Sequence, residues 1–144
     1  MKIKSFSLLE IIIAIVVIAI IISFAIPKFN QIDDKTNLFK LKSELSLIQE
    51  GISKIKSKNI LLGNSFILDS LDDSNINKKD EQLFSKVINF SIISTNSNEK
   101  KLGNWAKLSS KSYSFYLPSS SVLFALENGN FVCKSEENIC KEVE

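Results

Sequence analysis

The sequence predicts an α+β protein in which one long N-terminal helix packs on a small antiparallel β-sheet. Three observations lead to this fold class. Residues 6–26 are almost continuously apolar, and residues 38–55 carry apolar side chains at helical intervals. After residue 104 the chain changes to short runs rich in aromatic and β-branched side chains. With 144 residues, the chain has room for one domain beside an N-terminal anchor.

The apolar run Phe6–Ile26 comprises 21 residues, and only three polar side chains interrupt it. An α-helix rises about 1.5 Å per residue, so the run would span roughly 30 Å, the thickness of a bilayer core. Lys2 and Lys4 precede it, and the positive-inside tendency would hold that end in the cytoplasm. We therefore expect a single transmembrane segment, with the rest of the chain on the other side of the membrane.

Glu10 is the one charged residue in this run. A carboxylate costs on the order of 2.5–3.5 kcal/mol near the bilayer centre, so such a residue usually marks a function. One interpretation places Glu10 close enough to the headgroups to be solvated. The other supplies a cation, because cleavage between Ser5 and Phe6 would create an α-ammonium one helical turn before Glu10. In a packed assembly this amine could pair with Glu10 of a neighbouring subunit and select one axial stagger.

The basic leader, a small residue, the letters F-S-L-L-E and an apolar run resemble the class III leader of type IV pilins and type II secretion pseudopilins. The resemblance covers residues 1–58 and includes Pro27, which lies 21 residues after Phe6 in an A-I-P-K context typical of this family. It implies a pilin-like fold. It also implies that a prepilin peptidase and methyltransferase removes the leader peptide, residues 1–5, and N-methylates Phe6. Glu10 would then guide subunit docking into a helical filament.

The same resemblance implies partners and a location. The partners would be the processing peptidase, an inner-membrane assembly platform, other pilin-like subunits in a homo- or hetero-filament, and membrane lipid before assembly. The protein would lie in the bacterial inner membrane, with a cytoplasmic N-terminus and a periplasmic C-terminal domain. It would act as a pseudopilin or minor pilin in protein secretion, DNA uptake or pilus biogenesis. Ser5 stands where the family usually has glycine, and Ser7 where threonine is more usual.

Two other fates of the N-terminus remain open. Ser23-Phe24-Ala25 is a small-x-small pattern that an ordinary signal peptidase could cut. Against this, the run is longer than the roughly 7–15 apolar residues of a secretory signal, and it contains a charge. The second alternative is an uncleaved anchor, which would hold a monomeric periplasmic binding module at the membrane.

The composition argues against an enzyme. The chain contains no histidine, which is the commonest general base and metal ligand, and its four glycines leave no room for a phosphate-binding loop. Without Lys2 and Lys4 of the leader, 16 lysines face 16 acidic residues, so no overall basic character favours nucleic acid. We expect no catalytic residue, no cofactor and no metal site. DNA is a possible but unsupported partner.

Residues 27–58 are expected to form the amphipathic half of the same helix. Pro27 should kink the helix rather than end it, because the helical pattern resumes at once. The apolar side chains follow at spacings of three and four, at Leu38, Leu41, Leu45, Ile48, Ile52 and Ile55. We expect this seam to pack on the protein's own domain, although a coiled-coil dimer is an alternative. Three lysines near the helix end, Lys54, Lys56 and Lys58, could touch DNA, but a solvated helix terminus is favoured.

Residues 59–144 are expected to form a small periplasmic α+β region. Ile60–Leu62 followed by Gly63-Asn64 marks the helix exit. The connection over residues 65–80 contains four aspartates, whose spacing lacks an EF-hand pattern, so solvation is favoured over calcium. They are Asp69, Asp72, Asp73 and Asp80. Apolar residues at helical intervals predict a short helix within Asp80–Asn89, and Phe90–Ser94 is expected to be a strand.

Three further strands are expected at Asn104–Leu108, Ser112–Leu117 and Ser121–Glu127. Asn128-Gly129 is the strongest hairpin signal in the sequence and leads into Phe131–Cys133. These strands should form an antiparallel meander laid across the amphipathic helix. The expected core aromatics are Trp105, Tyr113, Phe115, Tyr116 and Phe124. Packing in the core is favoured over a DNA-stacking platform for Trp105 and the tyrosines.

Cys133 and Cys140 lie near the C-terminus with six residues between them. Outside the inner membrane, such a pair is expected to form a disulfide, which would stabilise the fold by about 2.5 kcal/mol. Two free thiols are the alternative. A metal site is poorly supported, because two thiolates without histidine make only half a tetrahedral ligand set.

Overall fold

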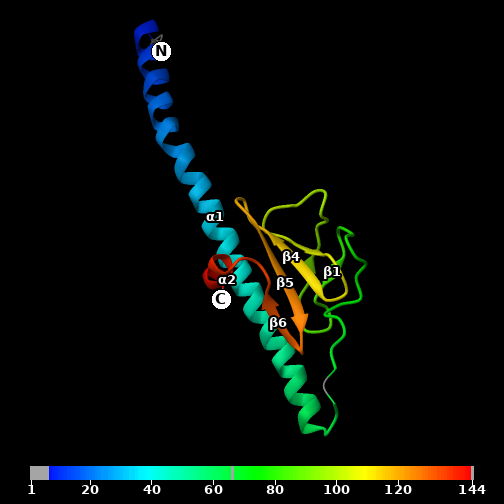
Figure 1. The fold of residues 1–144 in the computed structure, drawn as a ribbon. Coiled ribbons are helices and arrows are strands. Elements are labelled where there is room, and N and C mark those ends of the chain that lie inside the picture. Colours follow the sequence, from blue (N-terminus) through cyan, green and yellow to red (C-terminus); the bar gives the residue numbers. More distant parts are fainter. Residues whose placement is uncertain (1–6, 66, 144) are drawn as a thin grey trace, which may run out of the picture. The chain divides into compact units, whose positions relative to one another are not determined.

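The computed structural model describes residues 7–65 and 67–143, apart from the side chains of residues 27–34. The chain divides into two compact units, Met1–Lys35 and Thr36–Glu144. The fold is α+β, as the sequence predicts. It combines a long N-terminal helix, whose first part is apolar, with two small antiparallel sheets (Figure 1).

Helix α1 spans Leu8–Leu61 and includes Pro27, so the proline does not end the helix. The predicted kink falls on residues 27–34, whose side chains lie outside the described part. The exit is where the sequence predicts it. Gly63 adopts a φ of 70°, and the N–H of Asn64 donates to the carbonyl of Asn59 at 3.0 Å. A glycine in this left-handed conformation is the usual C-terminal cap, since it turns the chain away without a steric penalty.

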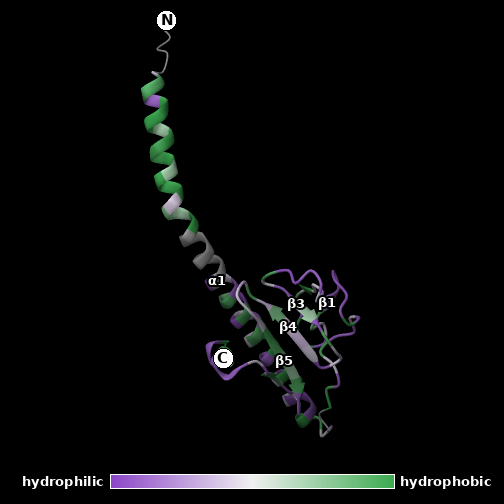
Figure 2. Ribbon diagram, turned by 45° about the horizontal axis from the view of Figure 1, so that its top comes forward, coloured by the Kyte–Doolittle hydropathy of each residue, from purple (hydrophilic) through white to green (hydrophobic). Residues whose placement is uncertain are grey.

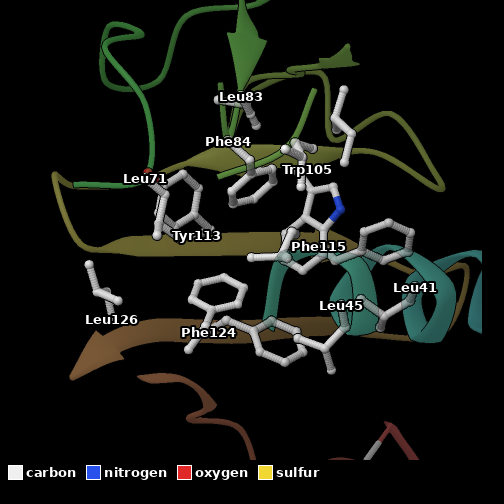
Figure 3. Close-up of a cluster of buried hydrophobic side chains, with 14 of the residues drawn as sticks. Leu41, Leu45, Leu71, Leu83, Phe84, Trp105, Tyr113, Phe115, Phe124 and Leu126 are labelled. Carbon is white, nitrogen blue, oxygen red and sulfur yellow. The ribbon is translucent and has the colours of Figure 1, made fainter. Parts of the chain in front are cut away.

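Within the unit Thr36–Glu144, the apolar seam of α1 packs on the protein's own domain, as predicted. Leu41, Leu45, Ile48 and Ile52 are at most 3% exposed. Figure 3 shows Leu41 and Leu45 directed at the aromatic cluster. Figure 2 shows the corresponding colour pattern: the apolar first part of α1 is almost uniformly green, whereas green and purple residues alternate in its later turns.

A four-stranded meander covers this seam. Its strands are β3 (Trp105–Lys107), β4 (Ser112–Tyr116), β5 (Ser121–Glu127) and β6 (Asn130–Cys133), and they pair antiparallel in that order. The predicted strands are confirmed to within one or two residues at their ends. The hairpin is also confirmed: Asn128 and Gly129 have φ values of 50° and 73°, and Glu127 pairs with Asn130. Positive φ at both central residues matches the right-handed twist of the flanking strands.

Four of the five expected aromatic residues belong to the core cluster (Figure 3), whereas the fifth, Tyr116, is buried outside it. Trp105, Tyr113, Phe115 and Phe124 are fully buried, and Tyr116 is 6% exposed. Phe84 and Phe131 join them. Phe84 meets Trp105 edge-on, with ring centroids 5.3 Å apart, and Phe124 stacks on Phe131 at 5.4 Å. Such pairs add about 0.5–1.5 kcal/mol each beyond the area that they bury.

The prediction of a helix within Asp80–Asn89 is wrong. Strand β1 (Gln82–Leu83) pairs antiparallel with β2 (Ile92–Ile93), and a tight turn follows β1. Phe84 has a φ of 58°, which a right-handed helix excludes. Its N–H donates to the side chain of Asp72, and both Leu83 and Phe84 face the core. Tertiary contacts therefore override the helical spacing of the apolar residues. Of the strand expected at Phe90–Ser94, only its centre forms.

The C-terminus contains a helix that the sequence analysis did not predict, α2 (Glu137–Val143). The expected disulfide joins Cys133 at the end of β6 to Cys140 in α2, so the free-thiol alternative does not apply. Val143 is 3% exposed, and Ile139 packs on the core. The spacing of these two residues by four was an available signal, but seven residues are too few to form a helix without such anchoring.

Candidate functional site

The most unusual feature of the first unit is the apolar part of α1. Leu8–Ile26 has a mean hydropathy of 3.1, and none of it is buried. Among the described residues this is one helix long and apolar enough to cross a membrane, by length and composition alone, a test that a signal sequence also passes. Its large side chains are exposed by about half or more, for example Ile12 at 50% and Phe24 at 74%.

This surface is apolar on every side of the helix, since exposed Leu, Ile, Val and Phe side chains occupy 14 of the 19 positions. Removing one such side chain from water is favourable by about 1.5–3 kcal/mol. A helix that is hydrophobic all round is buried in a membrane or among other helices. Leu8–Ile26 is therefore a surface of the kind that a membrane or other helices cover.

Glu10 lies in the first turn of this helix. The carbonyl of Ser7 accepts the N–H groups of Glu10 and Ile11 at 3.0 and 3.3 Å. The Glu10 side chain is exposed among apolar neighbours, near the end of the helix where a negative charge is favoured. The Glu10 carboxylate can therefore form an ion pair with a cation that another molecule supplies. The predicted processing residues, Ser5 and Phe6, lie outside the described residues.

A second polar site lies in the core of the domain, and the sequence analysis missed it. Asp72 was expected to be solvated, but it is 1% exposed, so this expectation is wrong. Its Oδ1 lies 2.7 Å from Nζ of Lys107, which is 5% exposed on β3. Its Oδ2 accepts the hydroxyl of Tyr113 at 2.9 Å and the N–H of Phe84 at 3.0 Å. Ser74 donates its N–H and its hydroxyl to Oδ1 at 3.1 and 2.6 Å.

These contacts decide the charge of the site. Burial by itself would raise the pKa of Asp72, but the hydrogen bonds from Lys107, Phe84, Ser74 and Tyr113 outweigh burial and hold that pKa below its ordinary value. Burial and the neighbouring carboxylate raise the pKa of Tyr113. The site is thus an ionised carboxylate and a neutral phenol, each with partners. Such a cluster joins the loop at Asp72 to β3, β4 and the turn at Phe84, and its contacts assign it a structural role.

The remaining aspartates of the connection behave as expected. Asp69 and Asp73 are exposed and lie 4.0 and 2.6 Å from Lys111 and Lys86, and Asp80 is exposed as well. Within residues 7–65 and 67–143, no group of three or more His, Cys, Asp or Glu side chains lies close enough together to hold a metal ion.

Polar side chains of α1 fix its second part to the sheet. Nε1 of Trp105 donates to Oε2 of Glu44 at 2.8 Å, and Nζ of Lys40 donates to the carbonyl of Gly103 at 2.6 Å. Burial raises the pKa of Glu44, although the Trp105 hydrogen bond and Lys40 act in the opposite direction. Nε2 of Gln49 donates to the carbonyl of Phe131 at 3.2 Å.

Because Trp105 and both tyrosines are buried, they cannot serve as a stacking platform for DNA.

Two grooves flank the later turns of α1. One, of about 450 Å³, lies between α1 and residues 86–90, and Lys54 and Lys58 line it. The other, of about 290 Å³, lies between α1 and residues 129–132, and Lys56 lines it. The three lysines near the helix end therefore do not form one patch, because they are divided between two sides of the helix.

Comparison of the chain with protein-family models, with curated proteins and with solved structures finds no match.

Proposed function

We propose that this protein is a structural subunit, a pseudopilin or minor pilin, that assembles through its N-terminal helix into a type IV pilus-like filament or a type II secretion pseudopilus. The observation that supports this most directly is the helix Leu8–Ile26, which is apolar on every side, has no buried residue and carries one carboxylate, Glu10.

The carboxylate favours an assembly helix over a simple anchor. A plain anchor gains nothing from Glu10 and loses stability when this residue enters the membrane. In an assembly of parallel helices, a cation on the neighbouring helix offsets that cost and rewards a single axial stagger. The cation that we propose is the α-ammonium of Phe6, released by cleavage after Ser5 and then N-methylated.

The proposed life cycle follows from this pairing. The subunit resides in the inner membrane with its N-terminus cytoplasmic and Thr36–Glu144 periplasmic. The prepilin peptidase processes it, and an assembly platform transfers it from lipid into a filament of pilin-like subunits. The Cys133–Cys140 disulfide supports the periplasmic placement, because disulfides persist in oxidising compartments. The filament would serve protein secretion, DNA uptake or pilus biogenesis.

The processing step is tested by intact mass and N-terminal sequencing of the protein from its native host membranes. The proposal expects a chain that begins at N-methyl-Phe6. A chain that begins at Met1 would instead support a monomeric binding module with an uncleaved anchor. A chain that begins at Ile26 would indicate ordinary secretion and contradict the filament.

The assembly step is tested by Glu10→Ala. Removal of one member of a desolvated ion pair weakens association by about 3–5 kcal/mol, roughly a hundredfold or more, so assembled material should be lost. The measurement is the fraction of protein in sheared filaments. Glu99→Ala, which removes the same side chain from an exposed loop, is the matched control and should assemble normally. Normal assembly of the Glu10 variant would exclude the proposed pairing.

A further inference from the structure

We infer that the groove lined by Lys54 and Lys58 receives the acidic C-terminal segment, residues 136–142, of a second copy of this chain. We call these two surfaces the lysine groove and the acidic segment. The inference rests on the proposed function, since it identifies the contact between the globular units of neighbouring subunits.

The lysine groove combines charge with exposed apolar surface. Lys54 and Lys58 are exposed one turn apart on α1, and neither lies within 4.0 Å of an acidic group in the part of the chain that the structure describes. Leu47 and Phe90, which also line the groove, are 40% and 42% exposed. A flat solvated helix end would have neither this hollow nor these apolar side chains.

The other charged groups of the groove are less suited to bind an anionic partner than Lys54 and Lys58. Lys86 already donates to Asp73 at 2.6 Å and to Ser70 at 2.9 Å. Glu50, one turn before Lys54, adds one negative charge to the lining. The two lysines of α1 therefore carry the positive charge that remains available, and a partner with about two carboxylates matches it.

The acidic segment supplies these carboxylates on a fixed support. Glu136 and Glu142 are exposed and make no ion pair with a described residue, whereas Glu137 pairs with Lys141 at 2.6 Å. The disulfide and the buried side chain of Val143 hold α2 against the domain. Because the segment is already ordered, docking it costs little conformational entropy.

The two surfaces lie on different sides of α1, which makes a contact within one chain impossible. Val143 of α2 shares a hollow with positions 42, 45, 46 and 49 of α1, whereas positions 47, 50, 51, 54, 55 and 58 line the lysine groove. At 3.6 residues per turn, these two sets point roughly 160° apart around the helix axis. Along the axis, the two sets are centred about 7 residues, or roughly 10 Å, apart, and Lys54 and Lys58 themselves lie about 10 residues, or roughly 15 Å, beyond the centre of the first set.

Complementary surfaces on different sides of one molecule make a head-to-tail contact. Such contacts do not close into a dimer, and they propagate into rings or helical filaments. A neighbouring copy shifted by roughly 15 Å along the axis would bring its acidic segment level with Lys54 and Lys58. This contact has the geometry that a helical filament of parallel subunits requires.

Charge reversal tests the pairing in full-length protein in the native host. Lys54→Glu with Lys58→Glu should lower the assembled fraction about fivefold or more, as should Glu136→Lys with Glu142→Lys, because each creates like-charge contacts. All four substitutions together should restore assembly. Lys100→Glu with Lys101→Glu makes the same charge change on an exposed loop and should have no effect. The inference is wrong if the groove variant matches this control, or if the fourfold variant stays defective.

Zero-length carbodiimide cross-linking of the wild-type protein gives an independent readout. Mass spectrometry should find amide links from Lys54 or Lys58 to Glu136 or Glu142, and their yield should fall as ionic strength rises toward about 1 M. These links must join two copies, since the two surfaces point apart in one chain. If filaments form without these links, the inference fails while the proposed function stands. If the links form in membranes without filaments, the paired surfaces are supported while the filament proposal fails.

Discussion

Asp72 is the residue whose environment differs most from what its neighbours in the sequence suggest. It stands in a polar connection, beside the exposed Asp73, yet its carboxylate is buried against Lys107, Tyr113 and the N–H of Phe84. An ion pair in the core adds little net stability compared with apolar residues, but removal of one member leaves an uncompensated charge. The stability of the fold should therefore depend strongly on the single side chain of Asp72.

Asp72→Ala should lower the free energy of unfolding by about 3–5 kcal/mol, because the Lys107 ammonium loses its counter-charge in the core. Urea unfolding in mild detergent, followed through the fluorescence of the single tryptophan, Trp105, measures this loss. Asp73→Ala is the matched control and should cost less than about 1 kcal/mol, since its ion pair with Lys86 is solvated. Equal effects of the two variants would contradict the structural role of the buried cluster.

The same carboxylate should make stability depend on acid. Its pKa is lowered from the ordinary value of 3.8 in the folded state, so the unfolded chain binds more protons near that pH. The contribution of the ionised Asp72 side chain to the free energy of unfolding is therefore fully present above pH 3.8. It is lost as the pH falls through the lower pKa of the folded state. Unfolding midpoints in urea should decrease over this range, and Asp72→Asn should flatten the decrease. If the urea midpoint of the variant decreases with falling pH as steeply as that of the wild type, other carboxylates cause the acid dependence.

At the scale of elements, Gly51 explains how α1 meets the turn after β1. A glycine in a helix usually weakens it by about 1 kcal/mol relative to alanine. Here a Cβ at position 51 would overlap the carbonyl oxygen of Val87, so the close approach of helix and turn needs the missing side chain. This contact joins residues 36 positions apart in the sequence, so no local sequence pattern predicts it.

Gly51→Ala should therefore destabilise the protein, opposite to its effect on helix propensity. Overpacking of this kind costs about 1–3 kcal/mol, against which the propensity gain of about 1 kcal/mol is small. Chemical unfolding measured as above gives the sign directly. Ser57→Ala, at an exposed position later in α1, should be neutral or slightly stabilising. A stabilising effect at position 51 would mean that the turn moves away freely.

Elements with a strong local signal were predictable. The seam of α1 was visible as spacings of three and four, and the β5–β6 hairpin was visible as Asn128-Gly129, because in both cases neighbouring residues specify the backbone. The segment from Asp80 to Asn89 has the same apolar spacing as a helix, yet it forms β1 and a turn. Its backbone follows from the bonds to Asp72 and from burial of Leu83 and Phe84, which are contacts with distant residues.

At the scale of the whole molecule, the two units differ in what their apolar side chains contact. The apolar seam of α1 within Thr36–Glu144 lies on a closed core, whereas no residue of Leu8–Ile26 is buried. The first unit therefore presents an apolar surface long enough to cross a membrane. The second unit contains its own core, its disulfide and all the described strands.

A chain that begins at Thr36 should fold without the first unit. All seam residues from Leu38 onward remain, so Trp105 should have the same fluorescence maximum as in the full-length protein. The truncated chain should stay in solution without detergent, because the exposed apolar helix is gone, and it should not form filaments. Circular dichroism and sedimentation measure these outcomes. Aggregation or loss of the buried tryptophan signal would show that the unit cannot fold by itself.

The sequence by itself determined the features that depend on local pattern: the apolar helix with Glu10, the amphipathic seam, the meander with its Asn-Gly turn, and the cysteine pair. Local pattern suffices for these because hydrophobic period, length and turn chemistry act between near neighbours. Only the tertiary structure decided the burial of Asp72 with Lys107, the turn at Phe84 and the separation of the lysine groove from the acidic segment. Each of these depends on groups far apart in the chain, whose desolvation and pairing are settled only when the core closes around them.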